Sequence, residues 1–292
     1  MNIKHAFKQC ARALGNDDWC EQLDRHFVAL KRRGPRLVVT FDNMTSRDAH
    51  GPRNPWGWNI VESLGHSHLG VCMSRRNDWF RHPDLFDLFD RLRDQGFFEQ
   101  FEDVVFYGSS MGGYGALSFA QAAPGARVVA FVPQTTLCPD LAPFEQRFLN
   151  GRERGDYKDR RYVDGAVGAG TARSVAVFYD PYHAPDRAQV ERLPADNLQL
   201  FRAPFFGHKV PRLLHMMGSI RELTVAALND ELTAEKWKAA MAGRYQTPGY
   251  IRILLNAALE QGHHSLVSRA LPRAEAHLTR PLPKYRRLVA IP

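Results

Sequence analysis

The stretch Gly108-Ser109-Ser110-Met111-Gly112 places a serine between glycines, directly after an apolar run and before a segment that predicts a helix. It matches the pattern G-x-S-x-G with Ser110 at the nucleophile position. A serine on such a sharp turn points its hydroxyl above a sheet, and flanking glycines avoid collisions with the neighbouring strand and helix. The N-terminus of the helix also directs backbone N–H groups toward developing negative charge. The chemistry predicted here is nucleophilic attack on a carbonyl carbon.

A serine hydroxyl is a weak nucleophile, so Ser110 needs a base. The chain has twelve histidines. We favour His208 because it follows Gly207 in a loop directly after the last predicted strand, where the chain can turn the imidazole toward the serine. The other histidines that we weighed precede a predicted helix, flank a strand or lie in the C-terminal tail: His183, His66, His68, His263 and His264.

An acid is needed to fix the tautomer of the histidine and to stabilise the imidazolium. It should follow a strand between the serine and the histidine. Asp180 directly follows the apolar run 175–179, and the interval to His208 leaves room for one helix and one strand. Asp186 begins the next predicted helix, where an aspartate has a structural role as N-cap. We therefore favour Asp180 as the acid, with Asp186 as the alternative.

Two backbone N–H donors should stabilise the oxyanion. One is expected at Met111, directly after the nucleophile, and the other near Asn43, in the loop after the predicted strand 37–41. We expect no metal and no cofactor. The motif H-E-x-x-H is absent, and His66-Ser67-His68 has no carboxylate or cysteine at ligand spacing.

The segment GSSMGGYGAL, residues 108–117, resembles the nucleophile elbow of the α/β-hydrolase superfamily, in particular serine esterases of the feruloyl-esterase and S-formylglutathione-hydrolase type. The resemblance covers roughly residues 36–222 and implies a doubly wound, mostly parallel sheet. The site residues that it implies are Ser110 as nucleophile, Asp180 as acid, His208 as base and the Met111 amide as oxyanion donor. The H-G-G-type loop common in the superfamily is replaced by Phe41-Asp42-Asn43.

Three side chains are candidates for substrate binding. Arg75 and Trp79 follow a predicted strand on the carboxyl side, where open α/β sheets bind ligands, and Tyr114 lies just beyond the elbow. Aromatic rings with an arginine suit a sugar or an acidic acyl ester. Core packing is the alternative role for the aromatic residues.

The elements that position these residues alternate along the chain. Short apolar runs are separated by amphipathic stretches, which predicts an α/β fold with a doubly wound, mostly parallel sheet and helices on both faces. The predicted strands are residues 37–41, 69–73, 104–107, 128–132, 175–179 and 198–201.

Other segments depart from the alternation. Residues 134–172 form a polar, glycine- and arginine-rich excursion, which suggests a cap over the site. We expect one hydrolase domain over residues 1–232 and a C-terminal helical extension over 233–292, packed on that domain. Residues 5–14 and 19–31 predict helices, which suggests a minimal sheet.

The composition is that of a globular protein: 292 residues, 44% hydrophobic and 24% charged, with a formal net charge of +8. No apolar run is long enough for a membrane span, and the N-terminus lacks the pattern of a secretory signal, so we expect a cytoplasmic protein with free cysteines and no membrane partner. Its basic clusters are not interleaved with aromatic residues, which favours a solvated surface over nucleic-acid binding. The sequence leaves the oligomeric state open.

Three functions remain in view. The favoured one is a serine hydrolase that cleaves an ester, such as an acylated carbohydrate or a small metabolite, through Ser110, His208 and an aspartate. The second is an acyltransferase that uses the same three residues. The third is a non-catalytic scaffold or binding protein on a hydrolase fold.

Overall fold

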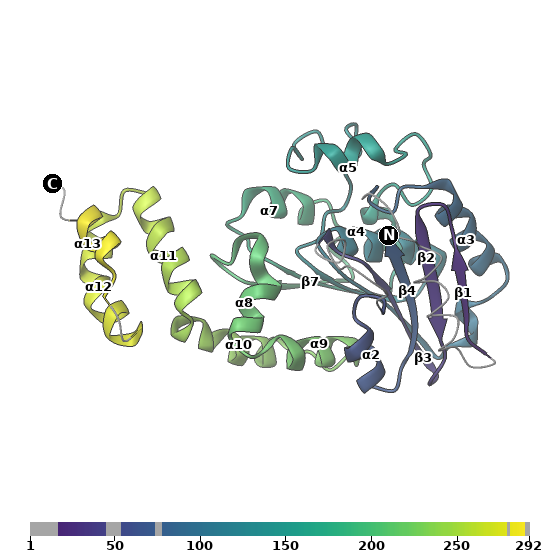
Figure 1. The fold of residues 1–292 in the computed structure, drawn as a ribbon, viewed down its shortest axis with the longest axis horizontal. Helices are drawn as coiled ribbons and strands as arrows, with labels where there is room; N and C mark the ends of the chain where they lie inside the picture. Colours follow the sequence, from purple (N-terminus) through teal and green to yellow (C-terminus); the bar gives the residue numbers. More distant parts are fainter. Residues whose placement is uncertain (1–16, 45–53, 74–77, 279–280, 290–292) are drawn as a thin grey trace.

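The protein is described here from a computed structural model, which covers residues 17–44, 54–73, 78–278 and 281–289. Its strands form one sheet in the order β1-β2-β4-β3-β5-β6-β7-β8 (Figure 1). The pairs from β4 to β8 are parallel, and β1 and β2 are antiparallel to their neighbours. The strands are β1 (Trp19–Gln22), β2 (His26–Lys31), β3 (Arg36–Phe41), β4 (Ser67–Met73), β5 (Asp103–Ser109), β6 (Arg127–Phe131), β7 (Ser174–Tyr179) and β8 (Leu198–Arg202). All six predicted strands are confirmed.

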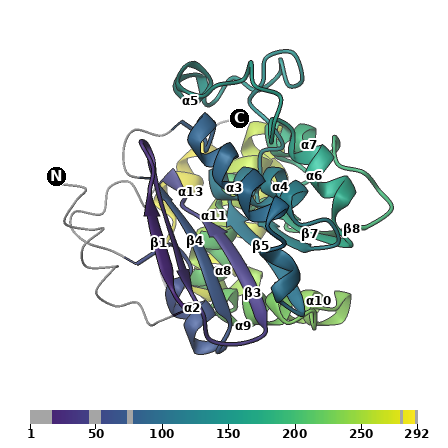
Figure 2. The ribbon, with the colours of Figure 1, turned by 90° about the vertical axis from the view of Figure 1, so that its right-hand side faces the viewer.

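Helices cover both faces of the sheet (Figure 2). Side chains alternate between two hydrophobic clusters because successive residues of a strand point to opposite faces. Along β5, Val104 and Phe106 belong to one cluster, and Val105 and Tyr107 to the other. The helices are α2 (Trp58–Ser63), α3 (Pro83–Asp94), α4 (Met111–Phe119), α5 (Leu149–Arg154), α6 (Gly165–Thr171), α7 (Ala184–Val190), α8 (Val210–Met216), α9 (Ile220–Leu228), α10 (Ala234–Ala242), α11 (Pro248–Glu260), α12 (His264–Leu278) and α13 (Pro283–Val289).

The prediction of a helix over residues 19–31 is wrong. β1 and β2 form an antiparallel hairpin, and β2 pairs with β4 over its whole length, from His26 opposite Met73 to Lys31 opposite His68. A short apolar run does not distinguish a buried strand from a helix by periodicity alone. Here the edge of β4 supplies the hydrogen-bonding partner, so the sheet is larger than the minimal one expected. The segment 5–14 lies outside the described residues.

The excursion between β6 and β7 carries α5, which lies above the carboxyl ends of the strands, and α6, which packs against α4 on one face of the sheet (Figure 2). Arg81, whose side chain is fully buried, anchors the excursion. Its guanidinium donates to the carbonyl oxygens of Asp156 (2.8 Å), Asp159 (2.5 Å) and Arg161 (2.5 Å). A buried charge is stable only when its donors are satisfied. These bonds therefore fix the excursion against the body of the protein.

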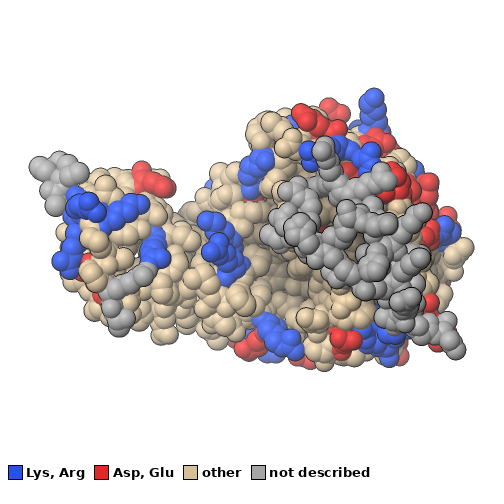
Figure 3. Space-filling view, viewed as in Figure 1, with Lys and Arg blue, Asp and Glu red and all other residues tan. Residues whose placement is uncertain are grey.

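The C-terminal helices α10 to α13 lie progressively farther from the sheet along the chain. Trp237 and Met241 of α10 and Tyr250 of α11 pack in the hydrophobic cluster beneath the sheet. The remainder of α11 forms a separate small core with α12 and α13, and these helices stand apart from the sheet (Figure 1). On the face shown in Figure 3, several Lys and Arg side chains lie on these C-terminal helices. In the described parts of the chain, every helix is too short or too polar to cross a bilayer.

Candidate active site

The turn between β5 and α4 has the strained geometry that the sequence predicts. Ser110 has φ 54° and ψ −117°, a region that non-glycine residues rarely adopt and that costs about 1–3 kcal/mol. Its N–H donates to the carbonyl oxygen of Phe131 on β6 (2.8 Å), and its own carbonyl accepts from Tyr114 in the first turn of α4 (3.0 Å). These two bonds hold the serine in place at the carboxyl edge of the sheet.

The glycines of the turn are required by close contacts. A Cβ at Gly108 would lie 2.0 Å from the carbonyl oxygen of Gly112, and a Cβ at Gly112 would lie 2.7 Å from that of Phe41. Both distances are shorter than any side chain tolerates. The end of β3 therefore packs directly on the first turn of α4.

His208 lies beside the serine. Its Nε2 is 2.8 Å from Oγ of Ser110, although the two residues are 98 positions apart in the chain. The short 3₁₀ helix Gly207–Lys209, which follows β8, carries the imidazole, and its side chain is 29% exposed. The predicted pair of serine and histidine is brought together.

The carboxylate next to His208 belongs to Asp186, so the preference for Asp180 is corrected. Nδ1 of His208 lies 2.9 and 3.0 Å from the two oxygens of Asp186. Since Nδ1–H donates to this carboxylate, Nε2 is left as the acceptor that faces the serine. Asp186 lies in the first turn of α7 and not at its N-cap, which is His183. Its side chain is therefore free to turn toward the imidazole.

Asp180 has a different position. It follows β7 and accepts hydrogen bonds from the N–H groups of Gly207 (2.7 Å) and Tyr182 (2.9 Å). It therefore fixes the backbone of the residue that precedes His208. The expectation that the acid directly follows a strand pointed to Asp180, which supports the loop that carries His208. The aspartate in contact with the ring is Asp186, in the first turn of the next helix.

Asp186 is fully buried and strongly stabilised as a carboxylate. Burial alone would raise its pKa. The adjacent His183 ring, a hydrogen bond from His208, the charge on His208 and a hydrogen bond from Arg147 outweigh that effect and hold the pKa of Asp186 well below its usual value. Nδ1 of His183 lies 3.1 Å from Oδ2, and Nη1 of Arg147 lies 2.7 Å from Oδ1. Asp186 is therefore ionised at neutral pH.

Sequence reasoning missed Arg147 and its partner Glu145. Arg147 is 39 positions from Asp186 and comes from the excursion, so no local spacing links the two. The available signal was the pattern Glu-x-Arg inside an otherwise unexplained insertion.

The expected oxyanion donors lie in the predicted region. Met111 is the first residue of α4, and its side chain is buried. Asn43 follows the end of β3. This end packs on the first turn of α4, because a Cβ at Gly112 would lie 2.7 Å from the carbonyl oxygen of Phe41 and 3.0 Å from that of Asp42. Their role as donors stays a prediction.

The aromatic candidates for substrate binding are packing residues. Trp79 and Tyr114 are fully buried. The ring of Trp79 lies 4.9 Å from that of Phe148, and the hydroxyl of Tyr114 donates to the carbonyl oxygen of Tyr162 (2.9 Å). Both therefore bind the excursion to the body of the protein and present no surface to a ligand. Arg75 lies outside the described residues.

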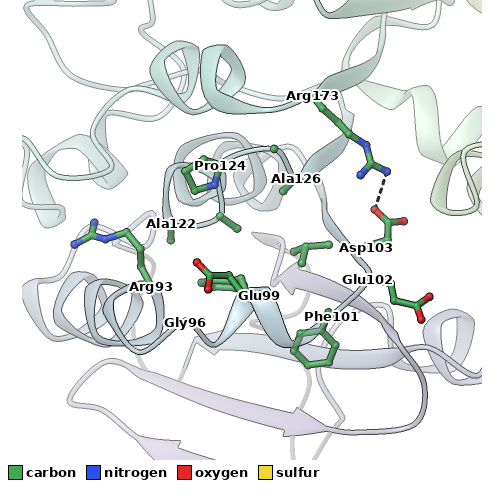
Figure 4. Close-up of a pocket in the computed structure, with 14 residues that line it drawn as sticks. Arg93, Gly96, Glu99, Phe101, Glu102, Asp103, Ala122, Pro124, Ala126 and Arg173 are labelled. Carbon is green, nitrogen blue, oxygen red and sulfur yellow. Dashed lines mark hydrogen bonds and ion pairs between the residues drawn. The ribbon is translucent and has the colours of Figure 1, made fainter.

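A cavity of about 380 Å³ lies at the other end of the strands from Ser110 (Figure 4). It includes Asp103 at the start of β5 and Arg173 before β7, which form an ion pair at 2.9 Å. Ligands in open α/β sheets bind at the carboxyl ends of strands, and this cavity is at the amino ends. It is therefore separate from the Ser110 site. Among the described residues, no group of three or more His, Cys, Asp or Glu side chains is placed to bind a metal ion.

No protein-family model and no curated protein matches the chain. Solved structures with a similar arrangement include a capsule O-acetyltransferase of Neisseria meningitidis serogroup A, at 13% identity and a TM-score of 0.49, over 72% of this chain and 93% of that one. An esterase/lipase from an uncultured bacterium has 12% identity and a TM-score of 0.43, over 82% and 92%. Carboxyl esterase 2 of Tuber melanosporum has 13% identity and a TM-score of 0.41, over 64% and 76%.

The chain's own topology defines its class. A mostly parallel eight-stranded sheet has helices on both faces, and a serine sits on a strained turn between strand and helix at its carboxyl edge. This is an α/β-hydrolase fold, as the sequence predicted.

Proposed function

We propose that the protein is a serine hydrolase that cleaves esters through Ser110, His208 and Asp186. The observation that supports this most directly is the Ser110–His208 contact of 2.8 Å, continued by the contact of His208 with Asp186. The turn after β5, the first turn of α7 and the 3₁₀ helix after β8 contribute these three residues. Such a continuous chain of contacts is the arrangement that activates a serine hydroxyl.

In the first half of the reaction, Oγ of Ser110 attacks the ester carbonyl carbon while its proton passes to Nε2 of His208. The tetrahedral intermediate carries its negative charge on the former carbonyl oxygen, beside the expected donors at Met111 and Asn43. When the intermediate collapses, the bond to the alcohol breaks and His208 returns the proton to the leaving oxygen. The acyl group is then bonded to Ser110.

In the second half, water attacks the acyl-enzyme and gives its proton to His208. The bond between the acyl carbon and Oγ breaks, and the serine recovers its proton. Asp186 remains a carboxylate throughout and stabilises the imidazolium in both halves.

Acyl transfer to an alcohol is the second candidate, since it shares the first half-reaction. The observation that favours it is that the excursion reaches the site, since the ring of Phe148 lies 6.2 Å from the ring of His208. An acylated carbohydrate or a small metabolite suits either reaction.

The test uses p-nitrophenyl acetate with the wild type and two alanine variants. We expect Ser110→Ala to lose about 10⁴-fold or more in turnover, while the neighbouring Ser109→Ala stays within about tenfold. Equal turnover in wild type and Ser110→Ala contradicts the proposal and favours a scaffold. Added methanol separates the two enzymatic reactions, because an acyltransferase yields mainly methyl acetate and a hydrolase mainly acetate.

A further inference from the structure

The carboxylate of Asp186 is part of a longer charged chain. Arg147 donates from Nη1 to Asp186 (2.7 Å), and its Nε and Nη2 donate to the two oxygens of Glu145 at 2.9 and 2.6 Å. The Glu145 side chain is 1% exposed and that of Arg147 is 24% exposed. The contacts therefore run from His208 through Asp186 and Arg147 to Glu145, and the last two of these residues come from the excursion.

Glu145 is also held independently of Arg147. Nε2 of Gln189 donates to its Oε2 (3.2 Å), and Gln189 is one turn after Asp186 on α7. Oε1 of Gln189 accepts from the backbone N–H and the hydroxyl of Thr135 (2.8 and 2.6 Å). Glu145 therefore keeps a partner when Arg147 is replaced. The Arg147 guanidinium also lies over the ring of Phe148, with its Cζ 5.1 Å from the ring centroid.

Three formal charges face His208 along this chain: negative on Asp186, positive on Arg147 and negative on Glu145. Their sum is one negative charge, the same as for an isolated aspartate. Arg147 touches Asp186 directly, whereas Glu145 is linked to it only through Arg147 and Gln189.

We propose that Glu145 and Arg147 are positioning residues that act through Asp186 and set how strongly the site stabilises the His208 imidazolium. This inference rests on the proposed function. Loss of the Arg147 charge leaves the Asp186 carboxylate unopposed and favours the imidazolium. Loss of the Glu145 charge leaves Arg147 unopposed and disfavours it. The two changes therefore act with opposite sign.

Other charged groups near the histidine are unchanged in such variants. His183 lies against Asp186, Asp180 accepts from the N–H of Gly207, and Lys209 follows His208 in the same 3₁₀ helix. A difference between variants therefore reports on Glu145 and Arg147. If Glu145 takes up a proton once Arg147 is removed, the direction stays the same, because the guanidinium is the closer of the two charges to Asp186.

The test is the rate of labelling by a fluorophosphonate as a function of pH, measured on the full chain. The rate rises with pH as the imidazolium loses its proton, so its midpoint follows the charge on the histidine. We expect Arg147→Met to raise the midpoint by about one pH unit and Glu145→Gln to lower it by about the same amount. The double variant should return to within a few tenths of a unit of wild type. Arg147→Lys, which keeps the charge, should also stay near wild type.

Shifts of the same sign in both single variants, or no shift in either, overturn the inference. A purely structural role lowers the rate at every pH without opposite shifts. If Arg147→Met shows no cooperative thermal transition, Glu145→Gln decides alone, and a midpoint that rises or stays constant overturns the inference. Absence of labelling in the wild type contradicts the proposed function itself, which separates the two failures.

Discussion

Replacement of Asp186 or Asp180 by asparagine distinguishes the two candidate acids, of which the sequence favoured Asp180. Asp186 is fully buried and has both oxygens within 3.0 Å of Nδ1 of His208. At an effective dielectric constant of about 20, a carboxylate and an imidazolium about 3.5 Å apart attract each other by about 5 kcal/mol. Since 1.36 kcal/mol corresponds to a tenfold change in rate, Asp186→Asn should lower turnover by about 10³- to 10⁴-fold.

Asp180→Asn is the matched control. The variant keeps one amide oxygen that can accept from the N–H of Gly207 or Tyr182, so it loses about one hydrogen bond of about 1–2 kcal/mol. The expected loss of turnover is about 30-fold or less. The assay is hydrolysis of p-nitrophenyl acetate, with the thermal transition measured to show that both variants are folded. A folded Asp186→Asn variant within tenfold of wild type, or equal losses in the two variants, refutes the assignment of the acid.

Three further outcomes concern stability. In urea titration, Gly108→Ala should lower the unfolding free energy by about 3 kcal/mol or more, because the new Cβ meets a carbonyl oxygen at 2.0 Å. Gly170→Ala is the control and should be neutral or slightly stabilising, because its Cβ would meet no atom within 4 Å. In the same assay, Asp103→Ala should lower the unfolding free energy by about 3 kcal/mol, because it removes the carboxylate 2.7 Å from the buried guanidinium of Arg127. A decrease of less than about 1 kcal/mol would contradict this expectation. Burial raises the pKa values of Asp103 and Asp186, but hydrogen bonds and charges from arginines or histidines outweigh it and hold both values below their usual range. The stability that these two carboxylates contribute to the fold is therefore complete above about pH 5 and is lost as pH falls toward 2. A urea midpoint unchanged between pH 7 and pH 3 would contradict that sign.

The parts of the fold that local sequence determines were predicted correctly. The central strands are apolar throughout because helices cover both faces, and the pattern around Ser110 depends on contacts within a few residues. The histidine was found because its loop follows the last strand. These features are encoded by neighbouring residues.

The errors concern contacts between distant segments. The helix expected over residues 19–31 became a hairpin because β4 offered an edge with which it could pair. The preferred aspartate, Asp180, is not the one in contact with His208, because both aspartates follow β7 and only the direction of α7 shows which one reaches the imidazole. The contact between Arg147 and Asp186 joins an insertion to a helix after the next strand, and no pattern along the chain predicts it.

The most direct test of the central claim is identification of the residue that a fluorophosphonate modifies. After stoichiometric labelling at pH 8, digestion and mass spectrometry should place the adduct on Ser110, with Ser109→Ala labelled and Ser110→Ala not. Labelling should also fall sharply in His208→Ala, because the imidazole 2.8 Å away is the proposed base. An adduct on another residue, or full labelling of Ser110→Ala, would contradict the account.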